Sequence, residues 1–305
     1  EGEDITVEIL DVYKRAKREN WDKPRFLEAV SKVPGVYVPS FYTHTYDESG
    51  VLTAVTPKDG APEELKGTDF VKEIVVPMDR QHGDKLPVSL FKRHNCLDGT
   101  WENGTTAYSK RGVAVTVPQW NPDACIQCNR CAMACPHAAI RPVLLTEEEK
   151  AGAPESFVTV PAKGLGKDAP AYSFRMQVSP YDCLGCGVCL TACPAKDALT
   201  WAPFEEMKSE QPLFDDVAMN ETYLKKDVIS DKSVKNVQFA KPYFQFSAAC
   251  AGCAETTYIK LLSQLFGDRM YVGNAAGCSS AISGGAPILP YCRDEVFEHL
   301  KKIPE

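Results

Sequence analysis

The spacing of apolar residues predicts two helices and a hairpin in the first part of the chain. Apolar side chains recur at helical intervals through residues 5–33 until Pro34 and Gly35 end the pattern. Residues 36–55 then show short β-prone runs on either side of a polar turn, which predicts a β-hairpin. No residue here stands in a pattern typical of a catalytic or binding site, so a scaffold role is expected.

Short apolar runs predict that the next region, residues 68–118, is rich in β-strand. These runs cover residues 71–77, 87–91 and 112–118. The third run leads directly into the first of two cysteine-rich segments.

Two longer segments are expected to connect the remaining parts. The 46 residues from His137 to Asp182 separate the cysteine-rich segments, and we expect a β-rich insert with strands over residues 157–160 and 173–178. Residues 204–242 are strongly charged with only scattered aromatic residues, which is typical of a linker.

Composition limits the classes of function that need to be considered. At 305 residues the chain is long enough for two or more domains. The net charge of −7 and the lack of a basic patch with interleaved aromatic residues argue against nucleic acid as a partner. No apolar run reaches membrane-spanning length, and the acidic first residues lack the features of a signal peptide. No membrane association is expected.

Two cysteine runs of identical spacing carry the candidate chemistry. Both read C-x2-C-x2-C-x3-C-P, and the second begins 58 residues after the first. Such a pair is the signature of two 4Fe-4S clusters, in which three thiolates of one run hold one cluster and the fourth ligates the other. The sequence therefore predicts cluster one on Cys125, Cys128, Cys131 and Cys193, and cluster two on Cys183, Cys186, Cys189 and Cys135.

Other chemistry fits these cysteines less well. A zinc ribbon uses two separated C-x2-C pairs, a disulfide framework is typical of small secreted domains, and the radical-SAM order C-x3-C-x2-C does not occur in the chain. His137 either tunes a cluster by hydrogen bonding or is a local capping or surface residue. Cys96 is expected to be a free thiol. Oxygen-sensitive clusters need a reducing compartment, so a cytoplasmic, anaerobic setting is expected.

A third group of cysteines follows at the ends of predicted elements. A helix is predicted over residues 246–266, and a short strand over residues 270–274 leads into the next loop. Cys250, Cys253 and Cys278 thus present three thiolates at helix and strand ends.

Residues 68–290 resemble the central region of pyruvate:ferredoxin (flavodoxin) oxidoreductase, a thiamine-diphosphate enzyme with three iron-sulfur clusters. The resemblance is far more specific than the ferredoxin motif alone. The matching segments are Gly99-Thr100, Gly104-Thr105-Thr106, Tyr108 to Gly112, Cys125 to Cys131, Cys135 to Pro142, Cys250 to Cys253 and Asn274 to Ser280.

The resemblance implies a proximal 4Fe-4S cluster on Cys250, Cys253 and Cys278. The family supplies a fourth cysteine far downstream, and Cys292 is the local candidate in this chain. Glu255 falls where the family places a glutamate beside thiamine diphosphate. An acidic residue at this place is also favoured by the positive end of a helix, so both roles stay open.

In the whole enzyme, the resemblance implies, pyruvate and coenzyme A give acetyl-CoA and carbon dioxide, and electrons pass through 4Fe-4S clusters to ferredoxin or flavodoxin. This chain is expected to be the iron-sulfur electron-transfer section of such a 2-oxoacid oxidoreductase. The Gly-Asp-Gly motif of thiamine enzymes is not found in it. Thiamine diphosphate and Mg²⁺ are therefore expected only in the full-length enzyme, whose missing domains or subunits would be partners. A stand-alone two-cluster electron carrier and a structural metal domain are the alternatives.

The expected fold class is α+β. A two-cluster bacterial ferredoxin-like domain with a β-rich insert is flanked by an N-terminal α/β segment and a partial α/β thiamine-binding domain. The segment 1–67 also resembles part of cobalamin-binding-domain radical SAM proteins but lacks their cobalamin and cysteine motifs, so it is expected to be a scaffold or a foreign segment. The expected domains are residues 1–67 (helix and hairpin), 68–118 (β-rich linker domain), 119–203 (ferredoxin-like), 204–242 (linker) and 243–305 (truncated thiamine-diphosphate domain).

Overall fold

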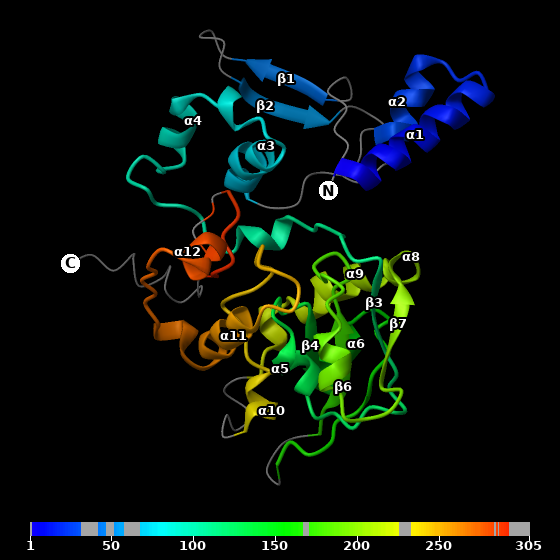
Figure 1. The fold of residues 1–305 in the computed structure, drawn as a ribbon, viewed down its shortest axis with the longest axis vertical. Helices are drawn as coiled ribbons and strands as arrows, with labels where there is room; N and C mark the ends of the chain where they lie inside the picture. The colour runs from blue at the N-terminus through cyan, green and yellow to red at the C-terminus, as the bar shows by residue number, and fades with distance from the viewer. Residues whose placement is uncertain are drawn as a thin grey trace. The chain divides into compact units, whose positions relative to one another are not determined.

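The computed structural model divides the chain into two compact units, Glu1–Gly99 and Thr100–Glu305. Figure 1 labels the elements of both. The division falls inside the segment that was expected to form a separate linker domain. The structure describes residues 2–31, 42–46, 52–57, 68–166, 171–225, 233–283, 285 and 287–292.

The first unit begins with the two expected helices and the expected hairpin. Helix α1 (Gly2–Arg18) packs against α2 (Lys23–Ser31), where the rings of Tyr13 and Phe26 meet edge to face at 6.0 Å. Strands β1 (Tyr42–Tyr46) and β2 (Leu52–Pro57) pair antiparallel. Residues 36–41 and 47–51 of the expected hairpin lie outside the described residues.

The strands expected over residues 71–77 and 87–91 are wrong, because both segments are helical. A π-helical turn (Val71–Val75) continues into α3 (Val76–Asp79), and α4 (Val88–Arg93) follows. Val71 and Ile74 stand three residues apart and are fully buried, so they share one helical face. Burial of that face overrides the β preference of the branched residues, and the described part of this region is therefore helical rather than β-rich.

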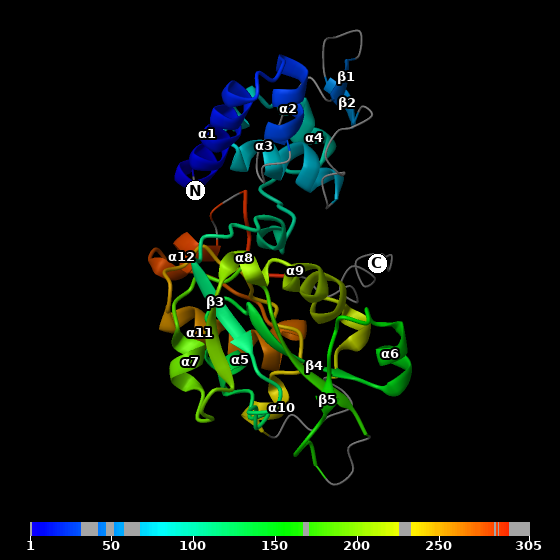
Figure 2. The same cartoon turned by 90° about the vertical axis from the view of Figure 1, so that its right-hand side faces the viewer.

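The second unit contains a two-stranded ribbon and a three-stranded sheet, both antiparallel. In the sheet, β6 lies between β4 and β5. In the ribbon, Val117 of β3 lies opposite Ala202 of β7, and Figure 2 shows the ribbon beside the sheet. The strands are β3 (Thr116–Trp120), β4 (Ile140–Leu145), β5 (Val160–Pro161), β6 (Ser173–Val178) and β7 (Leu199–Pro203).

The sequence predicts these strands unevenly. The bounds of β6 agree with the expected strand, whereas β3 starts later than the apolar run from Gly112 suggested. Of the strand expected over residues 157–160, only Val160 lies in β5. Between β4 and β5 the chain forms the short helix α6 (Glu147–Gly152), which begins with a capping box.

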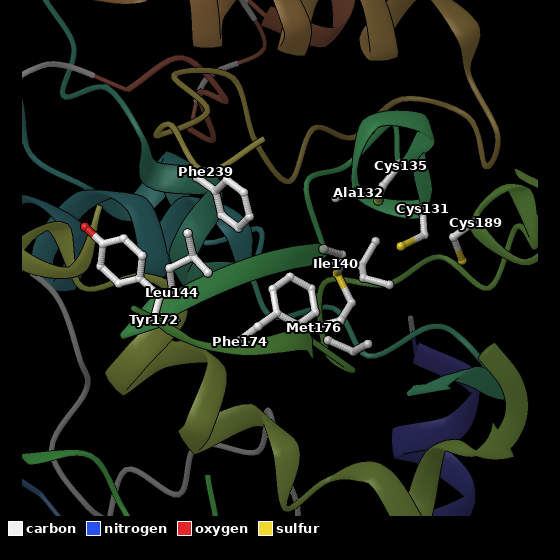
Figure 3. Close-up of a cluster of buried hydrophobic side chains, with 12 residues drawn as sticks. Cys131, Ala132, Cys135, Ile140, Leu144, Tyr172, Phe174, Met176, Cys189 and Phe239 are labelled. Carbon is white, nitrogen blue, oxygen red and sulfur yellow. The ribbon is translucent and has the colours of Figure 1, made fainter. Parts of the chain in front are cut away.

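A core of buried side chains lies against the three-stranded sheet. Phe174 of β6 meets Trp120 at 6.1 Å and Phe239 at 6.4 Å, in both cases edge to face. Figure 3 shows Cys131, Cys135 and Cys189 at one end of this core. Two one-turn helices bring these cysteines there, α5 (Arg130–Ala134) and α7 (Val188–Ala192).

Residues 204–242, which were expected to be a linker, pack against the sheet in their described part. The described part forms α8 (Phe204–Met207), α9 (Glu210–Leu213), a π-helical turn (Phe214–Ala218) and α10 (Val234–Val237). Phe214 is fully buried and packs with residues of β4 in a second core. The few apolar residues of the segment are therefore enough to attach it to the sheet.

The last part of the second unit is helical and irregular. Helix α11 (Ala254–Phe266) ends at Gly267, and α12 (Cys278–Ser283) follows. The strand expected over residues 270–274 is wrong, because this segment has no regular structure and Tyr271 is 88% exposed. Without burial, β-prone residues gain no partner there. Short 3-10 turns cover Gly83–Lys85, Thr105–Tyr108, Glu221–Tyr223 and Gly267–Arg269.

Candidate iron-sulfur centres

The two cysteine runs fold into loops of the same local form. Residues Gln127 and Gly185, at equivalent places, have φ values of 57° and 63°, and their backbone N–H groups donate to the sulfurs two residues earlier at 3.4 Å. Asn129 and Gly187 have φ values of 58° and 76° and precede α5 and α7. Backbone amides directed at sulfur stabilise thiolates and therefore suit cluster ligands.

A cavity opens between the second run and the end of the first. The cavity is partly open to solvent. Its lining includes Cys183, Cys186 and Cys189 of the second run together with Cys135 of the first. The structure thus brings together the four thiols that the sequence predicts for cluster two.

The buried thiol of Cys131 has its predicted cluster partners among its electrostatic neighbours. Burial raises the pKa of Cys131 to about 12, with further contributions from Cys125, Cys128 and Cys193. These three are the partners that the sequence predicts for Cys131 in cluster one. A thiol with so high a pKa is deprotonated only with compensating positive charge, which bound iron supplies.

The second group shows the same pattern. Burial raises the pKa of Cys183 to about 12, and the charges of Cys135 and Cys186 add to the rise. Burial also raises the pKa of Cys189, with contributions from Cys135, Cys183 and Cys186 of the same group and from Cys131 of the other. The last cysteine of each run thus acts on cysteines of the other run. This arrangement suits a two-cluster protein with crossed ligands.

A single-ion site is less compatible with this arrangement. Among the described residues, no three Cys, His, Asp or Glu side chains lie close enough to hold one metal ion. Zinc bonds its thiolates at about 2.3 Å and so draws them tightly together.

His137 lines the cavity of the second group. It is only 2% exposed, and neither ring nitrogen has a hydrogen-bond partner. Burial lowers the pKa of His137 to about 4, although the nearby backbones of Cys250 and Ser247 act in the opposite direction without meeting hydrogen-bond geometry. An unpartnered imidazole at the cavity wall has an N–H available for a bound group. Its burial excludes the surface location among the alternatives, and its tuning role stays a prediction.

The loop of the third cysteine group lies against the second group. Gly252 has a φ of 77°, and a β-carbon there would stand 3.5 Å from Val188 Cγ2 and 3.9 Å from Cys186 Cβ. Cys253 is the N-cap residue of α11. The segment before α11 is therefore packed beside the predicted ligands of cluster two.

The remaining candidates for the third site are not assembled in the described part of the chain. Cys250 and Cys278 are exposed, and Cys253 is half-buried. Cys292 lies in other surroundings, with its sulfur 3.5 Å from the position of a β-carbon on Gly104, and burial raises its pKa to about 11. Glu255 is exposed in the first turn of α11. Its exposure leaves its role as a cofactor ligand a prediction.

Some contacts around these loops were not foreseen from the sequence. Gln127 donates its side-chain amide to the carbonyl of Pro161 at 2.9 Å and accepts from the backbone of Lys163 at 2.7 Å, which ties the insert to the first loop. Lys260 of α11 is buried, and burial lowers its pKa to about 8. The buried face of α11 also carries Thr256 and Ser263. Polar residues at helical spacing ordinarily indicate a solvent-exposed face, so the sequence held no signal for this burial.

The fold and the two cysteine groups define a class, the proteins with a 4Fe-4S dicluster domain. The model of that domain family matches residues 124–197, and a second model, described as a domain of unknown function, matches residues 56–114. The first match covers both cysteine runs and the insert between them. Among the described helices, none is long and apolar enough to cross a membrane.

The similar proteins are more specific. The chain is 44% identical over 268 residues to a pyruvate:ferredoxin oxidoreductase of Moorella thermoacetica, covering 88% of this chain and 21% of the relative. It is 46% identical over 263 residues to a pyruvate-flavodoxin oxidoreductase of Enterobacter agglomerans, covering 86% and 21%. The resemblance predicted from the motifs is therefore confirmed: over most of its length the chain is a homologue of one segment of pyruvate:ferredoxin (flavodoxin) oxidoreductases.

The relatives also correct the interpretation of residues 1–67 as foreign. A pyruvate dehydrogenase [NADP(+)] of Cryptosporidium parvum is 41% identical over 292 residues, which cover 96% of this chain and 14% of the relative. With so little of the chain outside that alignment, most of residues 1–67 lie within it. The chain spans about a fifth or less of the length of these relatives.

Proposed function

We propose that this chain is the iron-sulfur electron-transfer section of a pyruvate (2-oxoacid):ferredoxin or flavodoxin oxidoreductase. One observation carries the proposal, namely that Cys135, the last cysteine of the first run, lines the cavity of Cys183, Cys186 and Cys189 of the second. Crossed ligands are the arrangement of a two-cluster ferredoxin. The names of the similar proteins supply the enzyme in which such a section works.

The residues of this chain would hold, shield and adjust two clusters. Each bound 4Fe-4S cluster would supply a site that takes up and releases one electron. Cys131, Cys135 and Cys189 reach the end of an apolar core, which keeps water away from one side. Backbone amides of Gln127 and Gly185 donate to sulfur and stabilise its negative charge.

The loop before α11 is proposed to face the carbon chemistry of the whole enzyme. It carries Cys250 and Cys253 and packs against Cys186, so it adjoins the second group rather than standing apart. A proximal cluster there would need Cys278 and a fourth ligand that we expect from another part of the enzyme. Conversion of pyruvate and coenzyme A, and binding of thiamine diphosphate near Glu255, would equally depend on parts outside this chain.

The chain also fits a second function, a stand-alone electron carrier, because both cysteine groups lie within one compact unit, Thr100–Glu305. The test is anaerobic reconstitution of the full chain, followed by iron and sulfide counts and EPR of the reduced protein. About eight irons per chain and two interacting signals are expected. Well under eight irons would overturn both functions.

Pyruvate-dependent reduction of methyl viologen separates the two functions. The chain alone, supplied with thiamine diphosphate and coenzyme A, is expected to give no turnover. Joined to the rest of its enzyme, the loaded chain is expected to restore turnover, whereas a variant with Cys135→Ser is expected to lower it strongly. If the joined enzyme turns over equally with and without the clusters of this chain, the clusters are not needed for its reaction. That result would favour the stand-alone carrier.

A further inference from the structure

The C-terminal carbonyl groups of α5 find their donors on another helix. The Lys260 ammonium group on α11 donates to the carbonyls of Met133 at 3.0 Å, Cys135 at 2.9 Å and Ala132. The Thr257 hydroxyl lies 3.4 Å from the carbonyl of Ala134. Three carbonyls at the end of a five-residue helix therefore have the Lys260 ammonium group as their donor, and the Thr257 hydroxyl, with its single proton, reaches a fourth.

The Lys260 ammonium group is buried, and burial of a charged group costs free energy. The residue is 2% exposed, and the acceptors found for its nitrogen are carbonyl oxygens rather than carboxylates. A helix C-terminus favours a cation, which offsets part of the cost of burial. The carbonyl acceptors of Lys260, from Ala132 to Cys135, directly follow Cys131, and Cys131 and Cys135 belong to different predicted clusters.

The same contact joins two parts of the proposed electron path. Helix α5 carries Cys131 and ends at Cys135, whereas α11 begins directly after Cys253. Figure 1 shows α11 beside α5, and the two helices are in contact. Thr257 also lies 3.4 Å from the carbonyl of Cys253, so one side chain reaches both cysteine segments.

We propose that Lys260 is a positioning residue for electron transfer, which clamps the segment of Cys250 and Cys253 onto α5 and places a buried positive charge beside the segment that carries ligands of both predicted clusters. This inference rests on the proposed function, because it presumes that both cysteine groups hold clusters. Each cluster becomes more negative on reduction, and a fixed cation nearby stabilises the reduced form. Lys260 therefore makes both clusters easier to reduce and holds the third cysteine group at a constant place beside them.

The test compares reduction potentials of the reconstituted full chain and its variants by EPR-monitored redox titration. Lys260→Met removes donor and charge, Lys260→Gln keeps a donor without charge, and Lys260→Arg keeps both. Lys150→Met is the control, because Lys150 is an exposed lysine on α6. At a fixed potential, both neutral variants are expected to show a ratio of reduced to oxidised cluster about tenfold lower, which corresponds to about 59 mV for a one-electron couple.

Unchanged potentials in Lys260→Gln with full iron content would overturn the proposal. If the neutral variants lose iron while Lys260→Arg keeps it, the charge is needed for assembly and the proposal stands. Loss of iron from Lys260→Arg as well would overturn the proposal, since cluster assembly would then depend on the shape of the side chain and not on its charge. Hydrogen exchange adds an independent readout, with faster exchange expected in α5 and α11 of Lys260→Met. An unmodified chain without iron would instead refute the proposed function itself.

Discussion

The ammonium group of Lys110 lies 2.8 Å from a carboxylate oxygen of Asp182, the residue immediately before Cys183. The same nitrogen reaches Asp215 at 2.9 Å, and the Ser179 hydroxyl donates to Asp182 at 2.7 Å. The Asp182 side chain is 2% exposed, and burial raises its pKa although Lys110 opposes the rise. One segment of the family resemblance thus holds the start of the second cysteine loop.

Lys110→Met is expected to destabilise the loaded protein by about 3–5 kcal/mol, because it leaves the buried Asp182 without its cation. Chemical denaturation followed by the loss of cluster absorbance measures this. Lys92→Met serves as control, since Lys92 is exposed on α4. Adding Asp182→Asn to Lys110→Met is expected to recover part of the loss, and a midpoint equal to that of Lys92→Met would contradict the prediction.

Crossed ligation predicts that each terminal cysteine affects the cluster of the other run. Cys135→Ser is expected to disturb the EPR signal and iron content of cluster two, and Cys193→Ser those of cluster one. Cys96→Ser is the matched control, because that sulfur donates to the carbonyl of His94 at 3.4 Å within the first unit. The reverse assignment of the two signals would show that ligation is not crossed.

His137→Leu is expected to make cluster two harder to reduce and to leave cluster one nearly unchanged. The imidazole lines the second cavity with both nitrogens unpartnered, so its removal deletes an N–H available to sulfur. His137→Asn retains a donor, so its reduction potential for cluster two should lie between those of His137→Leu and the unmodified chain. His82→Leu, in the other compact unit, provides the control, and equal potentials in all four proteins would disprove the role.

Gly185→Ala is expected to cost about 1–2 kcal/mol in backbone strain, with a further loss from crowding. Its φ is 63°, and the new β-carbon would stand 3.3 Å from both Ala114 Cβ and the carbonyl of Thr116. Gly99→Ala isolates the strain, because Gly99 has a φ of 86° and nothing within 4 Å of a β-carbon. Thermal unfolding should show the larger loss for Gly185→Ala; equal losses would mean that crowding is relieved.

Tyr291 provides a prediction for alkaline pH. Burial raises its pKa above the ordinary 10.0, and the charge of Glu255 adds to the rise. The native phenol therefore stays protonated where the unfolded one ionises, so its contribution to stability is full below pH 10 and falls as the pH rises further. The free energy of unfolding should decline more steeply above pH 10 than in Tyr291→Phe. Parallel curves for the two proteins would contradict this.

The sequence was most informative where chemistry imposes spacing. The two cysteine runs, the limits of β6 and the helices around Tyr13 and Phe26 follow from local patterns. It misled where burial decides, because the run from Val71 has a β-prone composition but buries a helical face. The charge of residues 204–242 likewise hid the buried Phe214.

The candidate site shows the same limit. Spacing alone groups the cysteines, but the contact of Lys260 with α5 joins residues about 125 positions apart and leaves no local trace. Nor does any pattern in the chain show that His137 lacks a partner. Such relationships arise only when distant segments pack, which single-sequence periodicity does not record.

The bonds of Gln127 to the insert break the equality of the two halves. The equivalent place in the second run is Gly185, which has no side chain and fits closely against Ala114. A duplicated motif with identical halves would give two equivalent electron sites and no preferred direction between them. Here the first run is hydrogen-bonded to the insert through Gln127, whereas the second run packs closely against the start of β3 at Gly185. The two sites therefore differ in their surroundings. Two clusters bound at these sites are therefore expected to differ in reduction potential, because one site has a glutamine where the other has a glycine.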